Sequence, residues 1–307
     1  MDTPREPAGT AIEGGIRTLP LSVIIPAKNE ARNLPHCLES LRRVSEVFVV
    51  DSQSTDGTVE IARSRGAQVV QFHYHGGWPK KRQWAIDTLP LTQEWVLLVD
   101  ADEALTPELA QEIALAIQDS RRDGYYMDLQ MHFLGRALKH CGANFCKLSL
   151  FRRGKGHYEC RLRNQDASMA DMEVHEHVVV NGATGRLENP ILHHNVESLS
   201  RYIQKHDEYS NWEANVWLHR ARNGDELSPA FFGTQAQRRR WLKRQFLGFP
   251  GAPVLFFLYR YILRLGFLDG TPGLIYCALQ GIQFFHIKAK IYELKSIRQQ
   301  QCGPKAE

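Results

Sequence analysis

Leu21-Ser22-Val23-Ile24-Ile25-Pro26-Ala27 is a short apolar run in which three of the seven residues are β-branched. Such runs are typical of strands buried on both faces of a parallel sheet. Asn33 follows it and can cap a helix. Similar alternation continues downstream, with strands predicted at residues 47–50, 69–72 and 95–99 and helices at residues 34–41, 58–65 and 80–88. This rhythm predicts an α/β fold with a mostly parallel sheet flanked by helices.

Acidic residues follow two of these strands. Asp51 ends the second strand, and Asp100 and Asp102 end the fourth. Ligands of open α/β sheets bind at the carboxyl ends of the strands. The sequence therefore places the candidate site at this edge of the sheet.

Composition narrows the class of protein. The chain has 307 residues, 43% hydrophobic and 23% charged, with a net charge of +4. These values are typical of a globular protein and give no sign of a nucleic-acid partner. Residues 1–20 are polar at their start and lack the apolar core of a secretion signal, so we expect a disordered leader and no disulfides among the six cysteines.

The second half is less regular. Strands are predicted at residues 125–133, 148–151 and 178–180, then an amphipathic helix over residues 198–220, with a boundary near residues 223–225. Residues 246–267 and 273–287 are apolar and aromatic, and Arg260 and Arg264 interrupt the first. Such helices suit the plane of a membrane interface, with a core helix pair or a dimer seam as the alternative. We therefore predict a domain over residues 21–225 and an amphipathic helical, membrane-interface segment over residues 226–307.

Three segments in fixed order carry a family resemblance: VIIPAKNE at residues 23–30, VVDSQSTDGT at 49–58 and LVDADE at 98–103. They resemble the family-2 glycosyltransferases with a GT-A fold, over about residues 21–225. Downstream segments at residues 174–177, 192–193 and 266–270 resemble a bacterial subgroup, the lipopolysaccharide-core β-glucosyltransferases. The resemblance implies an inverting, metal-dependent hexosyltransferase, with UDP-glucose or a similar UDP-hexose as donor. It also implies a lipid-linked glycan acceptor, such as lipopolysaccharide core, and a peripheral place on the cytoplasmic face of the inner membrane.

Donor-binding residues are expected on the strand-end loops. A carboxylate at Asp51 can accept a hydrogen bond from a pyrimidine N–H, and the family uses the matching residue in this way. For Asp56 two roles are equally favoured: a cap of the next helix, or a contact with the ribose or base. The resemblance assigns Glu30 to the ribose and a basic residue, Lys81 or Arg82, to the donor, although a solvated helix face is an equal alternative. The remaining expected donor-side residues are Pro26, Asn29, Asp100 and Ala101.

The Asp100-Ala101-Asp102 segment is the expected metal site. Two carboxylates in a chain leaving a strand can turn towards one hard cation, Mg²⁺ or Mn²⁺, which also binds diphosphate oxygens. The resemblance makes Asp102 the direct ligand ahead of Asp100. It also offers His193 as a further ligand, with an ordinary buried or surface histidine nearly as favoured.

An inverting transfer needs a base for the acceptor hydroxyl. The segment His175-Glu176-His177 matches the family's late carboxylate, so Glu176 is the expected base. His175 is the alternative, because the pKa of an unperturbed histidine lies near neutrality.

Other patterns in the sequence fit other classes of protein less well. Residues 237–241 (QRRRW) fit the Gln-x-x-Arg-Trp motif of processive synthases but are interpreted as a basic amphipathic helix. A zinc site formed by Cys141, Cys146, His157 and Cys160 is disfavoured, because the spacing from Cys141 to Cys146 is longer than in the usual zinc-binding cysteine pair. A nucleotidyltransferase would need a glycine-rich loop that residues 27–30 lack, and a non-catalytic scaffold is opposed by the intact acidic residues. Ser52 replaces the family's second aspartate, a departure that bears on base and sugar preference. Residues 141–147 lack an expected Trp-Tyr-Pro, so the acceptor could differ from the subgroup's.

Overall fold

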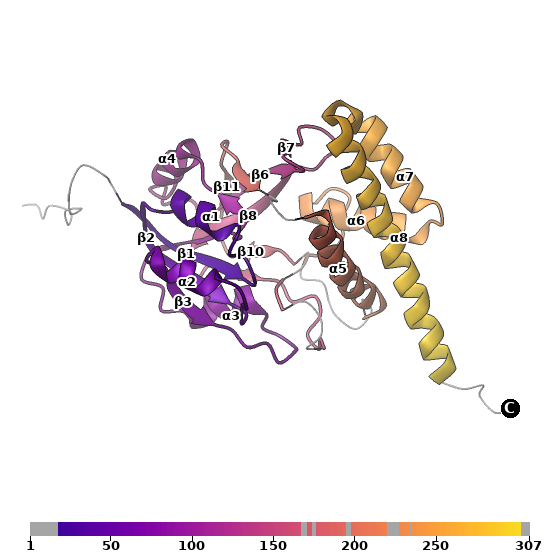
Figure 1. The fold of residues 1–307 in the computed structure, drawn as a ribbon, viewed down its shortest axis with the longest axis horizontal. Coiled ribbons are helices and arrows are strands. Elements are labelled where there is room, and N and C mark those ends of the chain that lie inside the picture. The colour runs from indigo at the N-terminus through magenta and orange to yellow at the C-terminus, as the bar shows by residue number, and fades with distance from the viewer. Residues whose placement is uncertain are drawn as a thin grey trace, which may run out of the picture.

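A computed structural model describes residues 18–166, 171–173, 176–194, 198–219, 227–233 and 235–301 (Figure 1). The expected leader lies mostly outside these residues, and so does the boundary near residues 223–225. Both therefore stay predictions.

The first hundred residues alternate as expected. In order they form β1 (Leu19–Ala27), α1 (Leu34–Ser40), β2 (Val44–Asp51), α2 (Thr58–Ser64), β3 (Gln68–Gln71), α3 (Lys81–Thr88) and β4 (Trp95–Leu98). The strands pair in parallel in the order β3-β2-β1-β4. Their carboxyl ends meet at one edge, which places Asp51 and the 100–102 segment at the same edge, on the two sides of β1.

The second half completes a mixed sheet. It adds β5 (Glu103–Ala104), α4 (Pro107–Ala116), β6 (Gly124–Phe133), β7 (Arg136–Ala137), β8 (Phe145–Arg152), β11 (Thr184–Arg186) and β12 (Ile191–His194). The sheet continues β4-β8-β6-β12-β5, with β8 antiparallel to both neighbours. β9 (Gly156–Tyr158) and β10 (Val178–Val180) form a separate antiparallel pair. The expected fold, a mostly parallel sheet flanked by helices, is confirmed.

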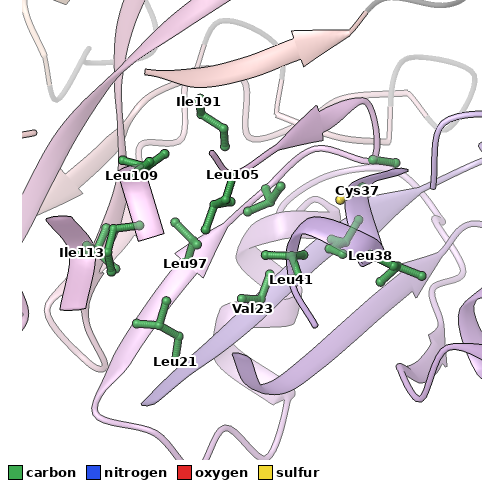
Figure 2. Packing of buried hydrophobic residues seen from close by; sticks show 14 of the residues in the cluster. Leu21, Val23, Cys37, Leu38, Leu41, Leu97, Leu105, Leu109, Ile113 and Ile191 are labelled. Carbon is green, nitrogen blue, oxygen red and sulfur yellow. The ribbon is translucent and has the colours of Figure 1, made fainter. Parts of the chain in front are cut away.

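The core explains the continuous apolar strands. Leu21, Val23 and Leu97 pack on one face of the sheet against leucines of α1 and α4 (Figure 2). The alternate residue Ile24 packs on the other face with Phe48 and Ala85. Full burial of one such side chain contributes about 1.5–3 kcal/mol, so both faces of β1 stabilise the fold.

The remaining regular elements of the described residues are helical. They are α5 (Leu199–His219), α6 (Gln235–Gly248), α7 (Ala252–Leu258), the π turn η1 (Tyr259–Leu263), the 3-10 turn η2 (Gly266–Asp269) and α8 (Gly270–Gln301). α8 packs against both α5 and α7 (Figure 1). Glycine allows this approach, because a Cβ at Gly281 would lie 2.9 Å from the Pro253 carbonyl oxygen. Among the described residues, no single helix is long and apolar enough to span a membrane, while one pair bent by 72°, Ala252–Leu263 with Gly266–Ile297, reaches that length and composition together.

The apolar stretch 246–267 is not one helix. The chain leaves α6 around Pro250 and Gly251, and Leu265 takes a left-handed conformation with φ of 57°. The break turns the chain back on itself, so that α7 and α8 form a hairpin with η1 and η2 at its end (Figure 1).

Candidate active site

Asp51 lies buried at the end of β2. Its carboxylate accepts hydrogen bonds from the Ser54 backbone N–H at 3.0 Å and from Gln71 Nε2 at 3.0 Å. These bonds hold the carboxylate at the carboxyl edge of the sheet. The expected contact with a base ring stays a prediction.

Asn29 ties the first two strand-end loops together. Its backbone is left-handed, with φ of 57°, a conformation that asparagine tolerates better than most residues. Its Oδ1 accepts the Thr55 N–H at 2.8 Å, and its own N–H donates to Ser54 Oγ at 2.7 Å. Pro26 is buried just before this turn. Both residues belong to this loop, and their expected contact with the donor stays a prediction.

Asp56 organises the start of α2. It accepts the Thr58 N–H at 3.0 Å and the Ala31 N–H at 3.1 Å. Partial burial acts to raise the pKa of Asp56, but the Thr58 hydroxyl and these N–H groups outweigh it and lower that pKa. These contacts support the role of Asp56 as a cap of α2, and its expected contact with the ribose or base stays a prediction. Glu30 nearby accepts a hydrogen bond from Asn33 Nδ2 at 2.8 Å and lies 3.6 Å from Lys205 Nζ of α5.

The basic start of α3 points inwards. Lys80, Lys81 and Arg82 are all buried, so the alternative of a solvated helix face is wrong. Lys81 Nζ donates to the Ala27 carbonyl at 3.1 Å and lies 3.2 Å from Asp171 Oδ2. Burial lowers the pKa of Lys81, although Asp171 opposes this. Arg82 donates to the Glu173 carbonyl at 3.0 Å.

Asp100 is held by two cations. It forms an ion pair with the Arg82 guanidinium, and Lys147 Nζ of β8 lies 3.6 Å from Oδ2. Burial acts to raise the pKa of Asp100, but Arg82 and then Lys147 outweigh it, so that its pKa is well below the usual range. Asp100 is therefore ionised and turned towards Arg82, with Ala101 buried beside it.

Asp102 meets His193 across two strands. β12 pairs antiparallel with β5, which sets His193 opposite Glu103 and its Nδ1 3.4 Å from Asp102 Oδ1. Nδ1 is buried and has no hydrogen-bond partner among the described residues. An orphaned imidazole nitrogen beside a carboxylate fits a divalent cation, for which both are ordinary ligands. In the described part of the chain, no three His, Cys, Asp or Glu side chains converge as a closed metal site. The protein thus offers a partial ligand set that diphosphate oxygens could complete.

Glu176 is paired rather than open. Its Oε2 accepts a hydrogen bond from Lys80 Nζ at 2.6 Å, and its Oε1 accepts the Arg161 N–H at 3.1 Å. Both side chains of the ion pair have no exposed surface, and Lys80 lies over the Trp212 ring. Burial raises the pKa of Glu176, although Lys80 opposes this. The alternative base, His175, lies outside the described residues.

The sequence profile of glycosyl transferase family 2 matches residues 22–175, half of the chain. This chain belongs to glycosyltransferase family 2. A lipopolysaccharide core biosynthesis glycosyltransferase of Rhizobium meliloti (strain 1021), LpsC, is 27% identical over 290 residues, covering 92% of this chain and 96% of LpsC. An uncharacterized glycosyltransferase of Rickettsia bellii is 38% identical over 109 residues, 35% of this chain and 36% of that protein. Among solved structures, residues 1–349 of S. aureus TarS align over 90% of this chain and 91% of that one, with 16% identity and a TM-score of 0.40.

Tertiary contacts add residues that sequence reasoning on this glycosyltransferase missed. Lys80 pairs with the expected base, and Lys147 bridges Asp100 to Glu103, with its Nζ 2.5 Å from Glu103 Oε1. Asp171 and Glu173 hold the start of α3. The sequence signal for Lys80 is its charge, because it stands directly before Lys81 and Arg82.

The QRRRW segment lies in α6, as a helix with Arg238 and Arg239 exposed, but not all of the basic residues of α6 face solvent. Arg240 is buried and forms a two-bond ion pair with Glu159, a residue with no exposed surface. Lys243 lies 2.6 Å from Glu213 of α5. These two cations therefore dock α6 onto the glycosyltransferase body instead of facing solvent. Cys141 packs against Cys277 of α8 in a buried cluster rather than with the other residues of the supposed zinc site.

Proposed function

We propose that this glycosyltransferase moves a hexose, with glucose the first candidate, from a UDP-sugar to a lipid-linked glycan such as lipopolysaccharide core, with inversion. The observation that carries the proposal is the orphaned Nδ1 of His193 beside Asp102, at the same sheet edge as Asp51. A base-binding carboxylate and a partial cation site at one edge match the two ends of a nucleoside diphosphate-sugar.

In this proposal, Asp51 accepts a hydrogen bond from the base, while Glu30 and Asp56 lie at the ribose. Asp102 and His193 would hold Mg²⁺ or Mn²⁺, with Asp100 beside them. A bound divalent cation stabilises the negative charge that develops on the leaving diphosphate. Lys81 and Arg82 add fixed positive charge at the same edge, and both are already oriented by carboxylates.

Glu176 is the proposed base. A raised pKa makes the Glu176 carboxylate a stronger base than an ordinary glutamate. Lys80 and the Arg161 N–H orient the carboxylate, and the acceptor must reach it past residues that now cover it. The proton of the acceptor hydroxyl passes to Glu176 as the oxygen attacks the anomeric carbon. The leaving UDP departs from the opposite face, so an α-linked donor gives a β-linked product.

The acceptor class and the location are further parts of the proposal. LpsC, similar over nearly the whole chain, bears the name of a lipopolysaccharide core enzyme. Such an acceptor is anchored in a membrane, so we place the protein peripherally at the cytoplasmic face of the inner membrane. Residues 226–307 are the proposed membrane-interface segment of the chain.

A donor screen tests the function. Purified protein is incubated with a panel of UDP- and GDP-sugars and Mn²⁺, Mg²⁺ or EDTA, and nucleotide release is measured. We expect metal-dependent release from one UDP-sugar and a loss of at least about 100-fold in Asp102→Asn, as for removal of other transition-state charge stabilisers. Release from no donor, or equal release by Asp102→Asn, contradicts the transferase chemistry and favours a scaffold with this fold.

A further inference from the structure

The end of the α7–α8 hairpin exposes many large apolar side chains. We define the α7–α8 corner as residues 252–274. Leu263 is 74% exposed and Leu268 is 57% exposed. The other large exposed apolar residues of the corner are Val254, Leu255, Leu258, Tyr259, Ile262, Leu265, Phe267 and Leu274. Large exposed apolar patches on a soluble protein mark surfaces that bind a partner or a membrane.

The corner is held in place by contacts with the loop between β7 and β8. Asp269 accepts the His140 N–H at 2.9 Å and lies 3.0 Å from His140 Nδ1. Arg260 donates to the Cys141 carbonyl at 3.0 Å, and the Cys141 N–H donates to the Arg264 carbonyl at 2.8 Å. A Cβ on Gly266 would lie 2.8 Å from Cys277 Sγ, so the turn is closely packed.

The charged side chains exposed around the α7–α8 corner are positive. Between residues 228 and 292, Asp269 is the only acidic residue, against nine lysines and arginines. The Asp269 side chain is 5% exposed, so it adds little negative surface. Three exposed cations surround the turn: Arg264 beside Gly142, Arg136 beside Gly270, and Lys139 next to His140. Within the described residues, no carboxylate pairs with any of these three.

The β7 hairpin belongs to the same surface. Figure 1 shows β7 next to the upper end of the α7–α8 hairpin, while the other end of α8 runs away from the body. Leu134 in the turn before β7 is 43% exposed and adds an apolar side chain on the side of the sheet. The surface therefore combines an apolar tip with a basic rim drawn from two parts of the chain.

We propose that the α7–α8 corner is the membrane-docking surface, and that it binds lipid bilayers with anionic headgroups. The apolar side chains enter the interface, and Arg136, Lys139 and Arg264 lie at the headgroups. The proposal refines the membrane location within the proposed function and rests on it. It assigns docking to one corner rather than to the whole of residues 226–307, because Arg240 and Lys243 are occupied by Glu159 and Glu213.

A second copy of the chain fits this surface less well. In a twofold dimer the same patch meets itself. A rim that carries only positive charge would then face an identical positive rim, and like charges across an interface are unfavourable. An anionic bilayer supplies the opposite charge as well as an apolar interior.

Vesicle co-sedimentation of the full chain tests the proposal. Vesicles of phosphatidylcholine alone are compared with vesicles that also contain phosphatidylglycerol, at low and high salt. We expect binding to the anionic vesicles that weakens with salt. Leu263→Asp with Leu268→Asp should weaken it at least about tenfold, and Arg136→Gln, Lys139→Gln and Arg264→Gln about fivefold for each charge removed.

Matched controls come from the catalytic half. Leu115→Asp changes an exposed leucine of α4 (73% exposed), and glutamines at Arg43, Arg63 and Arg65 remove three exposed charges. Neither control should alter vesicle binding, and circular dichroism checks that every variant folds. Corner variants that bind like these controls overturn the proposal. The proposal is also overturned if the wild-type protein binds neutral vesicles equally well. The same holds if it binds no vesicles and instead forms a dimer that the leucine changes break.

Activity separates this inference from the transferase chemistry. UDP release from the donor to water, measured without lipid, should be unchanged in the corner variants. Asp102→Asn should lose that release and still bind anionic vesicles. Failure of vesicle binding with intact release rejects the docking surface alone, and failure of release with intact binding rejects the transferase chemistry alone.

Discussion

Removing Lys80 while keeping Glu176 should destabilise the protein strongly. The two charges lie 2.6 Å apart with no exposed surface, and at an effective dielectric constant of about 20 their attraction is about 6 kcal/mol. Desolvation of the two ions offsets most of that attraction, but breaking such a pair leaves one buried charge and costs about 3–5 kcal/mol. We therefore expect Lys80→Met to lower the free energy of unfolding by that amount at pH 8.

The loss should depend on pH. Burial already raises the pKa of Glu176, and loss of Lys80 raises it further. A carboxylate with a raised folded-state pKa destabilises the folded protein as pH rises through the gap between its unfolded and folded values. The variant should therefore lose less stability at pH 5 than at pH 8. Urea unfolding at both pH values measures this, and a loss under about 1 kcal/mol at pH 8 refutes the reasoning.

The double variant separates structure from catalysis. Lys80→Met with Glu176→Leu replaces the ion pair by apolar side chains, a change that is often neutral for stability. If Glu176 is the base, the double variant should fold at near wild-type stability and transfer no sugar beyond about 1% of the wild-type rate, since general bases contribute about 100-fold or more. Near-normal transfer would show that Glu176 serves only the fold.

Three further outcomes follow from the same contacts. Mn²⁺ with UDP should raise the melting temperature of the wild-type protein by several degrees, but not that of His193→Ala, and an equal shift in both would argue against His193 as a ligand. Burial, with Arg240 nearby, lowers the pKa of His177 from its ordinary 6.5 to about 3. As pH falls, His177 therefore takes up its proton in the unfolded chain before it does so in the folded protein. The free energy of unfolding should then drop by up to about 1.4 kcal/mol per pH unit between pH 6.5 and about pH 3. Urea titrations should show that His177→Gln removes this slope. Arg240→Ala leaves the Glu159 carboxylate buried without its cation and should cost about 3–5 kcal/mol of stability, whereas Arg240→Met with Glu159→Leu should recover most of it in the same assay.

Much of the fold follows from local pattern. The LSVIIPA run and the three strands after it predicted parallel strands because a strand buried on both faces must be apolar throughout. Their last residues, such as Asp51 and Asp100, then had to share one edge. The helical content of the C-terminal part was also predictable from its apolar runs, but its break at Leu265 was not, because a left-handed leucine has no local sequence signature.

The sequence by itself determined the family, the parallel half of the sheet and the edge at which the candidate acidic residues lie, because these depend on spacing within short segments. The tertiary structure alone decided which side chains contact the candidate site residues. Lys80 meets Glu176 across 96 residues, and His193 reaches Asp102 only through the register of β12 against β5. Such pairings are fixed by strand register and by the need to neutralise buried charge. Both are properties of the packed chain that no single segment encodes.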